Sequence, residues 1–109
     1  MSEQASCHVE PLEKPLDPAA LASAEMAYLA VWGMGCPRCA MRVRNGLLGL
    51  DGVLTAEVLL ADGLAVAAYD PARLAPDDLV TAVAAAGNDG RHRYQAQLIQ
   101  RMRAAARLW

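Results

Sequence analysis

The succession of apolar patterns after residue 25 constrains the fold of this chain more than any other feature. Residues 26–33 carry the aromatic and β-branched side chains that are typical of a strand. Gly33 breaks this pattern, and Pro37 opens a segment with a different period. Apolar residues then recur three or four positions apart, at Ala40, Val43, Leu47 and Leu50. This spacing predicts an amphipathic helix that ends at Asp51-Gly52.

Two further apolar runs, residues 53–60 and 64–69, follow that helix and are joined by Ala61-Asp62-Gly63. An Asp-Gly pair between apolar runs is a strong hairpin signal, so we expect two antiparallel strands here.

A second helix is predicted to begin at Pro76, because proline suits the first helical position and two aspartates follow it. Leu79, Val83 and Ala86 give its apolar stripe, and Gly87 is suited to end it. Residues 91–99 then supply a last strand.

The resulting order, β-α-β-β-α-β, predicts a ferredoxin-like α+β sandwich. Two helices would cover one face of a four-stranded antiparallel sheet. The length of 109 residues suits one such domain. We expect three parts: a flexible acidic leader over residues 1–25, the folded domain over residues 26–99, and a basic C-terminal tail over residues 100–109.

Charge, apolar runs and cysteine content limit the possible partners and the cellular compartment. The net charge of −2 gives no field that would make nucleic acid the main partner. Glutamates and prolines interrupt the start of the chain where a secretory signal would need an apolar stretch, and the apolar run Leu79–Ala86 is too short to cross a bilayer. Three cysteines make a poor disulfide framework. We therefore expect a cytoplasmic protein without membrane insertion.

The chemistry lies where the first strand gives way to the first helix. Cys36-Pro37-Arg38-Cys39 places two thiols three residues apart across a helix N-terminus. Free amides and the helix dipole stabilise the thiolate there, and the thiolate is the metal-binding form. Two soft sulfur ligands favour Cu(I) or Hg(II) over hard ions. Zn(II) is less suited, since a closed zinc site needs four ligands.

The surrounding residues make this pattern more specific. Gly33-Met34-Gly35-Cys36-Pro37-Arg38-Cys39 resembles the Gly-Met-x-Cys-x-x-Cys signature of the heavy-metal-associated domain family. That family includes copper chaperones, N-terminal modules of metal-pumping P-type ATPases and mercury-binding proteins. The resemblance continues through Gly52-Val53, Tyr69-Asp70-Pro71 and Pro76-Asp77-Asp78-Leu79.

The resemblance implies that Cys36 and Cys39 bind the metal and that Met34 anchors the loop. It also implies transfer of the metal, by thiolate exchange, to an acceptor such as a metal-transporting P-type ATPase. We expect a monomer when metal is absent, with Arg38 and Arg42 as candidate contacts to the acceptor. In one respect the chain departs from the family, which carries an aromatic residue after the glycine that closes the second helix. Here Asn88 follows that glycine, so the aromatic cover of the metal loop is expected to be missing.

Three alternatives remain open at this point. Cys7 and His8 in the leader are candidate third and fourth ligands, which would shift the preference toward Zn(II). A Cys-x-x-Cys pair at a helix start is also used by thiol-disulfide oxidoreductases, although the order of strands and helices disfavours that class. The chain could also be a metal-sensing module of a larger transporter or reductase.

Overall fold

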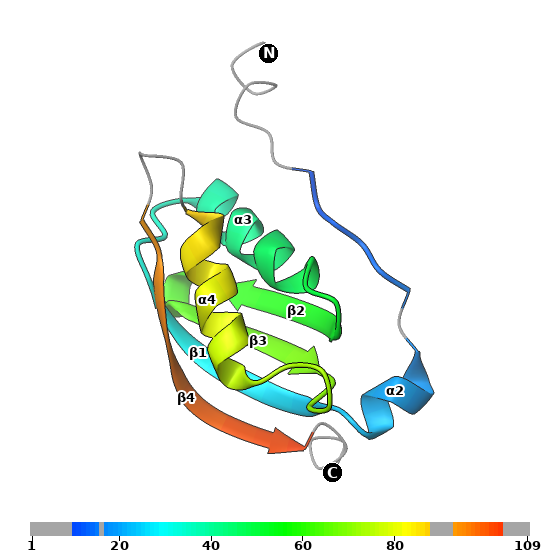
Figure 1. The fold of residues 1–109 in the computed structure, drawn as a ribbon. Helices are drawn as coiled ribbons and strands as arrows, with labels where there is room; N and C mark the ends of the chain where they lie inside the picture. The colour runs from blue at the N-terminus through cyan, green and yellow to red at the C-terminus, as the bar shows by residue number, and fades with distance from the viewer. Residues whose placement is uncertain (1–9, 16, 88–92, 104–109) are drawn as a thin grey trace.

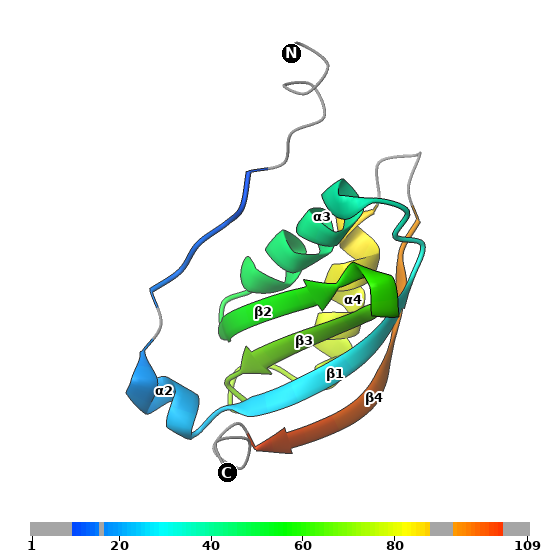
Figure 2. The ribbon, with the colours of Figure 1, turned by 180° about the vertical axis from the view of Figure 1, so that it is seen from behind.

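The structure is a computed structural model that describes residues 10–15, 17–87 and 93–103. Its elements are α2 (Pro18–Ala22), β1 (Glu25–Trp32), α3 (Pro37–Leu48), β2 (Val53–Leu59), a short 3-10 helix (Leu60–Asp62), β3 (Leu64–Tyr69), α4 (Pro76–Ala86) and β4 (Gln95–Arg103). The four strands form one antiparallel sheet in the order β2-β3-β1-β4. α3 and α4 lie together on one face of this sheet (Figure 1), and the view from behind shows the opposite face (Figure 2). The predicted ferredoxin-like fold is confirmed.

The core lies between the sheet and the two long helices. Along β1, Ala27, Leu29 and Val31 are buried, whereas Tyr28 is only half-buried and Trp32 is 52% exposed on the other face. The helices contribute four fully buried side chains, Val43, Leu47, Leu79 and Val83. Burying a side chain of this size stabilises the fold by roughly 1.5–3 kcal/mol. The buried side chains of the strand alternate along it, and those of the helices recur about every 3.6 residues. Both sets pack into one core.

The close packing of α4 explains why α3 has a glycine, Gly46, in its interior. A Cβ atom at this position would lie 3.2 Å from the Cβ of Ala86 and 3.4 Å from the carbonyl oxygen of Ala82, both in α4. A glycine within a helix destabilises it by roughly 1 kcal/mol relative to alanine. At this position, however, the missing side chain lets the two helices approach closely.

The hairpin between β2 and β3 closes at Gly63, as the Asp-Gly signal predicts. The short 3-10 helix precedes it, and Gly63 adopts a left-handed conformation with φ of 60°. Its carbonyl oxygen accepts a hydrogen bond of 2.8 Å from the backbone N–H of Val31 in β1. The turn is thereby tied to the end of the strand that leads into the cysteine loop.

The last strand differs from its expected position. β4 begins at Gln95 and continues to Arg103, whereas the sequence pattern placed it over residues 91–99. The strand pairs with the whole length of β1, so that Met102 lies opposite Met26. The pairing register of β1 with β4 shifts between Tyr28 and Leu29. β4 is an edge strand and Gln100 is exposed on it, so this polar side chain stays in water and does not end the strand.

Part of the expected leader contacts the domain. Asp17 caps α2 by accepting a hydrogen bond of 3.0 Å from the N–H of Ala19. Before it, residues 10–15, here called the strap, run along the outer flank of α3 and are hydrogen-bonded to it (Figure 1). Within the described ranges, no helix is both long enough and apolar enough to cross a membrane.

Candidate metal site

The cysteine loop follows directly from the end of β1 and is shaped by Gly33. This residue has φ of +99°, a conformation that favours glycine. A Cβ atom at Gly33 would clash with the carbonyl oxygen of Arg93, and it would lie 3.3 Å from the Cα of Tyr94. The loop therefore passes directly against the backbone that leads into β4. The end of β1 and the start of β4 thus lie together beside the cysteines.

The loop delivers both thiols to the first turn of α3. Cys36 is the N-cap residue, and its carbonyl oxygen accepts hydrogen bonds from the N–H groups of Cys39 (2.9 Å) and Ala40 (3.2 Å). The two sulfur atoms lie 3.7 Å apart, and neither is in a disulfide. Cys36 is half-buried, whereas Cys39 is only 4% exposed. The arrangement thus has an outer thiol that solvent can reach and an inner thiol that belongs to the core.

The separation of the sulfurs limits the coordination geometry. With metal–sulfur bonds of about 2.3 Å, sulfurs at the observed separation would enclose an angle of roughly 107° at the metal. A linear arrangement would need sulfurs roughly 4.6 Å apart, so the loop would have to open by about 1 Å. The observed geometry suits a bent pair that leaves room for a further ligand.

The environment of Cys39 favours its thiolate. Burial by itself raises the pKa of this thiol, because it disfavours the charged form. Hydrogen bonds outweigh that effect: they come from the Tyr94 side chain, from the backbone of Gly35, and from the side chain and backbone of Cys36. Together they lower the pKa of Cys39 to about 7. A substantial part of this thiol is therefore ionised at neutral pH and ready to bind a metal.

Tyr94 is the site residue that the sequence pattern did not reveal. It precedes β4 and is 2% exposed, although the sequence after Gly87 suggested that the loop had no aromatic cover. Its ring packs against Gly87, where an added Cβ atom would lie 2.7 Å from the ring carbon Cδ2. The expectation of a missing aromatic is therefore wrong, since a tyrosine from further along the chain lies beside Cys39.

The remaining predicted site residues are more scattered. Met34 is half-buried and packs against the core next to Cys36. Arg38 is exposed in the first turn of α3, and Arg42 is half-buried one turn later. Cys7 and His8 lie outside the described residues. Within the part of the chain that the structure describes, no group of three or more His, Cys, Asp or Glu side chains could hold a metal ion.

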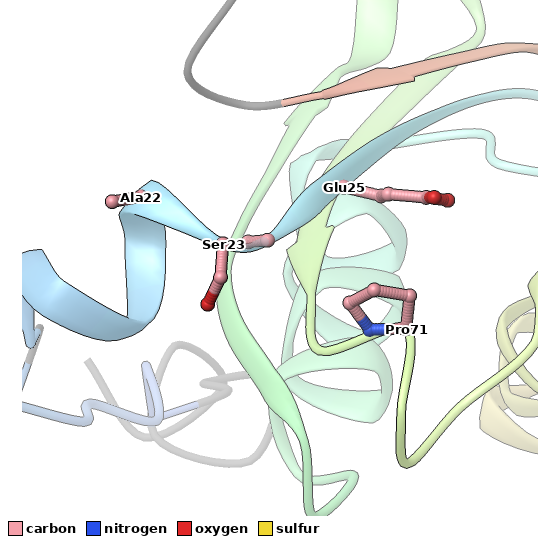
Figure 3. Close-up of a pocket in the computed structure, with 5 residues that line it drawn as sticks. Ala22, Ser23, Glu25 and Pro71 are labelled. Carbon is pink, nitrogen blue, oxygen red and sulfur yellow. The ribbon is translucent and has the colours of Figure 1, made fainter.

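One surface hollow lies near the site and another lies far from it. One, of about 310 Å³, lies beside the cysteine loop and is lined by Pro37, Ala40, Met41, Arg44, Val58 and Leu60. The other, of about 350 Å³, lies at the opposite end of β1, between α2 and Pro71 (Figure 3). There the side chains of Ser23 and Glu25 point in different directions, and Glu25 already accepts a hydrogen bond of 2.9 Å from the Tyr69 hydroxyl. The second hollow therefore offers no thiol and no converging ligand set.

Comparison with known proteins places this site in context. The family model described as the heavy-metal-associated domain matches residues 29–89. The chain is 44% identical over 62 residues to the mercuric reductase of Serratia marcescens, a match that covers 57% of this chain but only 13% of that enzyme. It is 36% identical over 61 residues to the copper chaperone CopZ of Staphylococcus aureus, and this match covers 56% of the chain and 90% of the chaperone.

A solved structure gives a similar result for the fold. The N-terminal domain of a potential copper-translocating P-type ATPase from Bacillus subtilis, in its Cu(I)-loaded state, superposes with a TM-score of 0.63 at 29% identity. The superposition covers 72% of this chain and 91% of that domain.

Proposed function

Because the chain belongs to the heavy-metal-associated domain family, we propose that Cys36 and Cys39 bind one Cu(I) ion through their thiolates. The observation that carries this proposal is the convergence of two sulfurs, 3.7 Å apart, at the N-terminus of α3. Two soft sulfur donors favour thiophilic ions over Mg²⁺ or Ca²⁺. The similarity to a copper chaperone, over 90% of that protein's length, supports Cu(I) as the ion.

We further propose that the ion is a cargo and that the chain acts as a metallochaperone rather than an enzyme. Cys36, the more exposed thiol, would exchange first. A thiolate of the acceptor forms a bond to the ion, the bond to Cys36 then breaks, and a second exchange releases Cys39. No electrons are transferred, and a released thiolate can take up a proton from the solvent.

Hg(II) is the second candidate cargo. The identity of 44% to part of a mercuric reductase favours it, and Hg(II) also accepts two sulfur ligands. The same match supports the alternative that the chain acts as a metal-binding module of a larger reductase or transporter. The sheet is antiparallel throughout, so the strand order keeps the thiol-disulfide oxidoreductase reading disfavoured.

The acceptor in this proposal is the metal-binding domain of a P-type ATPase, or another protein with a thiol pair, in the cytoplasm. Arg38 and Arg42 lie on α3 within one turn of Cys39, so an acidic surface that docked there would approach the cysteine loop. Met34 remains the proposed anchor that holds this loop against the core. The exchange requires no second copy of the chain, and we propose that the metal-free form is a monomer.

A transfer experiment tests this function. The Cu(I)-loaded chain is mixed anaerobically with the N-terminal metal-binding domain of a copper-translocating P-type ATPase. The two proteins are then separated and their copper content is measured. We expect copper to pass to the acceptor, and the double charge reversal Arg38→Glu/Arg42→Glu to slow the transfer at least fivefold.

Arg73→Glu is the control for a charge reversal elsewhere on the surface, since Arg73 is exposed and pairs with Asp51 at 3.0 Å, far from the cysteines in sequence. Retention of copper by the parent chain would refute the chaperone role. Equal transfer rates in the reversal variant and the control would refute the role of Arg38 and Arg42.

Cys7 and His8 remain proposed extra ligands for a higher-coordinate ion. The carbonyl oxygen of Glu10 is bound by the side chain of Asn45. Asn45 lies six residues after Cys39 in α3, a rise of about 9 Å along the helix. Cys7 lies three residues before Glu10, and three extended residues span about 10 Å. Chain length therefore permits Cys7 to reach the cysteine loop.

A further inference from the structure

The strap, residues 10–15, is held on α3 by one side chain that binds it as a neighbouring strand would. The side-chain oxygen of Asn45 accepts a hydrogen bond of 2.8 Å from the N–H of Leu12. The amide nitrogen of the same side chain donates a hydrogen bond of 2.6 Å to the carbonyl oxygen of Glu10. Asn45 therefore recognises an extended backbone at two points.

Arg44 adds a third hydrogen bond between α3 and the strap. Its guanidinium donates a hydrogen bond of 2.8 Å to the carbonyl oxygen of Leu12, so both backbone groups of Leu12 are bound by α3. The same guanidinium lies 3.2 Å from the side-chain oxygen of Asn45. The two adjacent helix residues thus form one binding surface for an extended segment.

Lys14 gives the strap a second attachment. Its ammonium group donates hydrogen bonds to the carbonyl oxygens of Leu50 (2.9 Å) and Val53 (2.7 Å), just after the end of α3. A cation is favourable at this end of a helix, where free carbonyl groups carry partial negative charge. The strap therefore runs parallel to α3, with Lys14 at the C-terminal end of the helix.

The strap is held by polar contacts more than by packing. All its described residues are exposed except Lys14, and the side chain of Leu12 remains 40% exposed above Gly49. Burial of apolar surface is the main source of lasting attachment in proteins. A segment that buries so little can be displaced by a competitor that makes similar hydrogen bonds.

The charges of the strap and of the helix are complementary. α3 contains Arg38, Arg42 and Arg44 and no acidic residue. The strap contributes Glu10 and Glu13. Arg44 also lines the 310 Å³ hollow beside the cysteine loop, so the strap binds a residue that borders the candidate metal site.

We propose that the strap is an intramolecular cover over a docking surface on α3, and that an extended acidic segment of a partner protein displaces it. Asn45 would bind the backbone of that segment, and Arg44 would provide the cationic contact. This surface lies outside the cysteine pair, and its occupancy does not depend on a bound metal. This inference rests on the proposed transfer function, in which displacement of the strap would control docking of the partner.

The test compares two variants of the full chain that leave α3 unchanged. Leu12→Pro/Lys14→Met removes the N–H bound by Asn45 and the ammonium bound at the end of α3. Leu12→Ala/Lys14→Arg keeps both donors and is the matched control. Release of the strap is followed by the heteronuclear NOE of the Glu13 amide, which falls when a backbone becomes mobile on the ps–ns timescale.

Docking is measured with a fluorescein-labelled peptide that has the strap sequence. We expect the release variant to bind this peptide about tenfold more tightly than the control in low salt. Adding Arg44→Ala to the release variant should abolish that gain. The loss of Lys14 makes the release variant more acidic, so the charge change itself works against the expected result.

Two results would overturn the proposal. One is an unchanged Glu13 NOE in the release variant, which would show that these hydrogen bonds do not hold the strap. The other is a mobile strap with no gain in peptide affinity, which would show that the strap covers no docking surface. Neither measurement uses metal, so failure here is distinct from failure of the proposed metal transfer.

Discussion

The side chain of Tyr94 helps to lower the pKa of the Cys39 thiol, although the two residues lie on different elements far apart in the sequence. Tyr94 precedes β4, and Cys39 lies in the first turn of α3. The antiparallel pairing of β1 with β4 brings the start of β4 beside the end of β1, from which the cysteine loop departs. The fold thereby supplies a hydroxyl group to the buried thiol.

Replacing this hydroxyl should make Cys39 less acidic. In Tyr94→Phe the ring remains, so the packing against Gly87 is retained while the hydrogen bond is lost. We expect the pKa of Cys39 to rise, because burial still raises it and one compensating donor is gone. The pH dependence of iodoacetamide alkylation, measured by mass spectrometry, reports the change. Tyr28→Phe, on the open face of the sheet, is the control; an unchanged pKa in Tyr94→Phe would contradict the assigned contact.

The lowered pKa of Cys39 also predicts how the reactivity of this thiol changes with pH when Tyr94 is retained. In a Cys7→Ser/Cys36→Ser variant, in which serine still offers a hydroxyl donor, alkylation of Cys39 should rise with pH through about 7. In urea the midpoint should move to about 8.5, the value of a free thiol. The unfolded state then binds more protons over this interval, so the free energy of unfolding should rise with pH between these two values and fall as pH drops through the lower one. Equal midpoints with and without urea would refute the shift.

Gly87→Ala tests the packing of the aromatic cover. The new Cβ atom would lie 2.7 Å from Cδ2 of Tyr94, so the ring must move away from α4. We expect a loss of about 1–3 kcal/mol in the free energy of unfolding, as for other overpacked sites. The pKa of Cys39 should rise in parallel, because the displaced hydroxyl no longer reaches the sulfur. Denaturation in urea and the alkylation profile measure the two effects.

Gly35→Ala serves as its control, since a Cβ atom at Gly35 meets nothing within 4 Å. A Gly87→Ala variant as stable as Gly35→Ala, with an unchanged alkylation profile, would show that Tyr94 does not pack as described.

If Cys7 and His8 are ligands, their replacement should affect the affinities for Zn(II) and Cu(I) differently. A Cys7→Ser/His8→Ala variant should lose at least tenfold in affinity for Zn(II), which requires more ligands than the cysteine pair provides. Its affinity for Cu(I) should be unchanged, because two sulfurs suffice for that ion. Competition with a chromophoric chelator measures both affinities. An unchanged affinity for Zn(II) would remove Cys7 and His8 from the site.

The sequence predicted most of the fold because its signals are local. The alternation around Leu29, the spacing of Val43 and Leu47, and the Asp-Gly pair before the left-handed Gly63 each specify an element or turn from nearby residues. These patterns also led to the ferredoxin-like order of strands and helices. The convergence of Cys36 and Cys39 follows equally from local spacing across a helix start.

The features that escaped prediction depend on contacts between distant residues. Tyr94 enters the site through strand pairing, and no local pattern connects it with Gly87. The extension of β4 to Arg103 similarly depends on β1 as its partner. The strap is bound through backbone groups by Asn45, and backbone recognition leaves little trace in the sequence of the bound segment.

The most direct test of the central claim is an anaerobic titration of the reduced chain with Cu(I) against a competing chelator. The account predicts one tight site per chain that is lost in Cys36→Ser/Cys39→Ser and retained in Cys7→Ala. Circular dichroism of the double variant establishes that it still folds. Binding by the folded double variant as tight as that of the parent chain would contradict the assignment of Cys36 and Cys39 as the metal ligands.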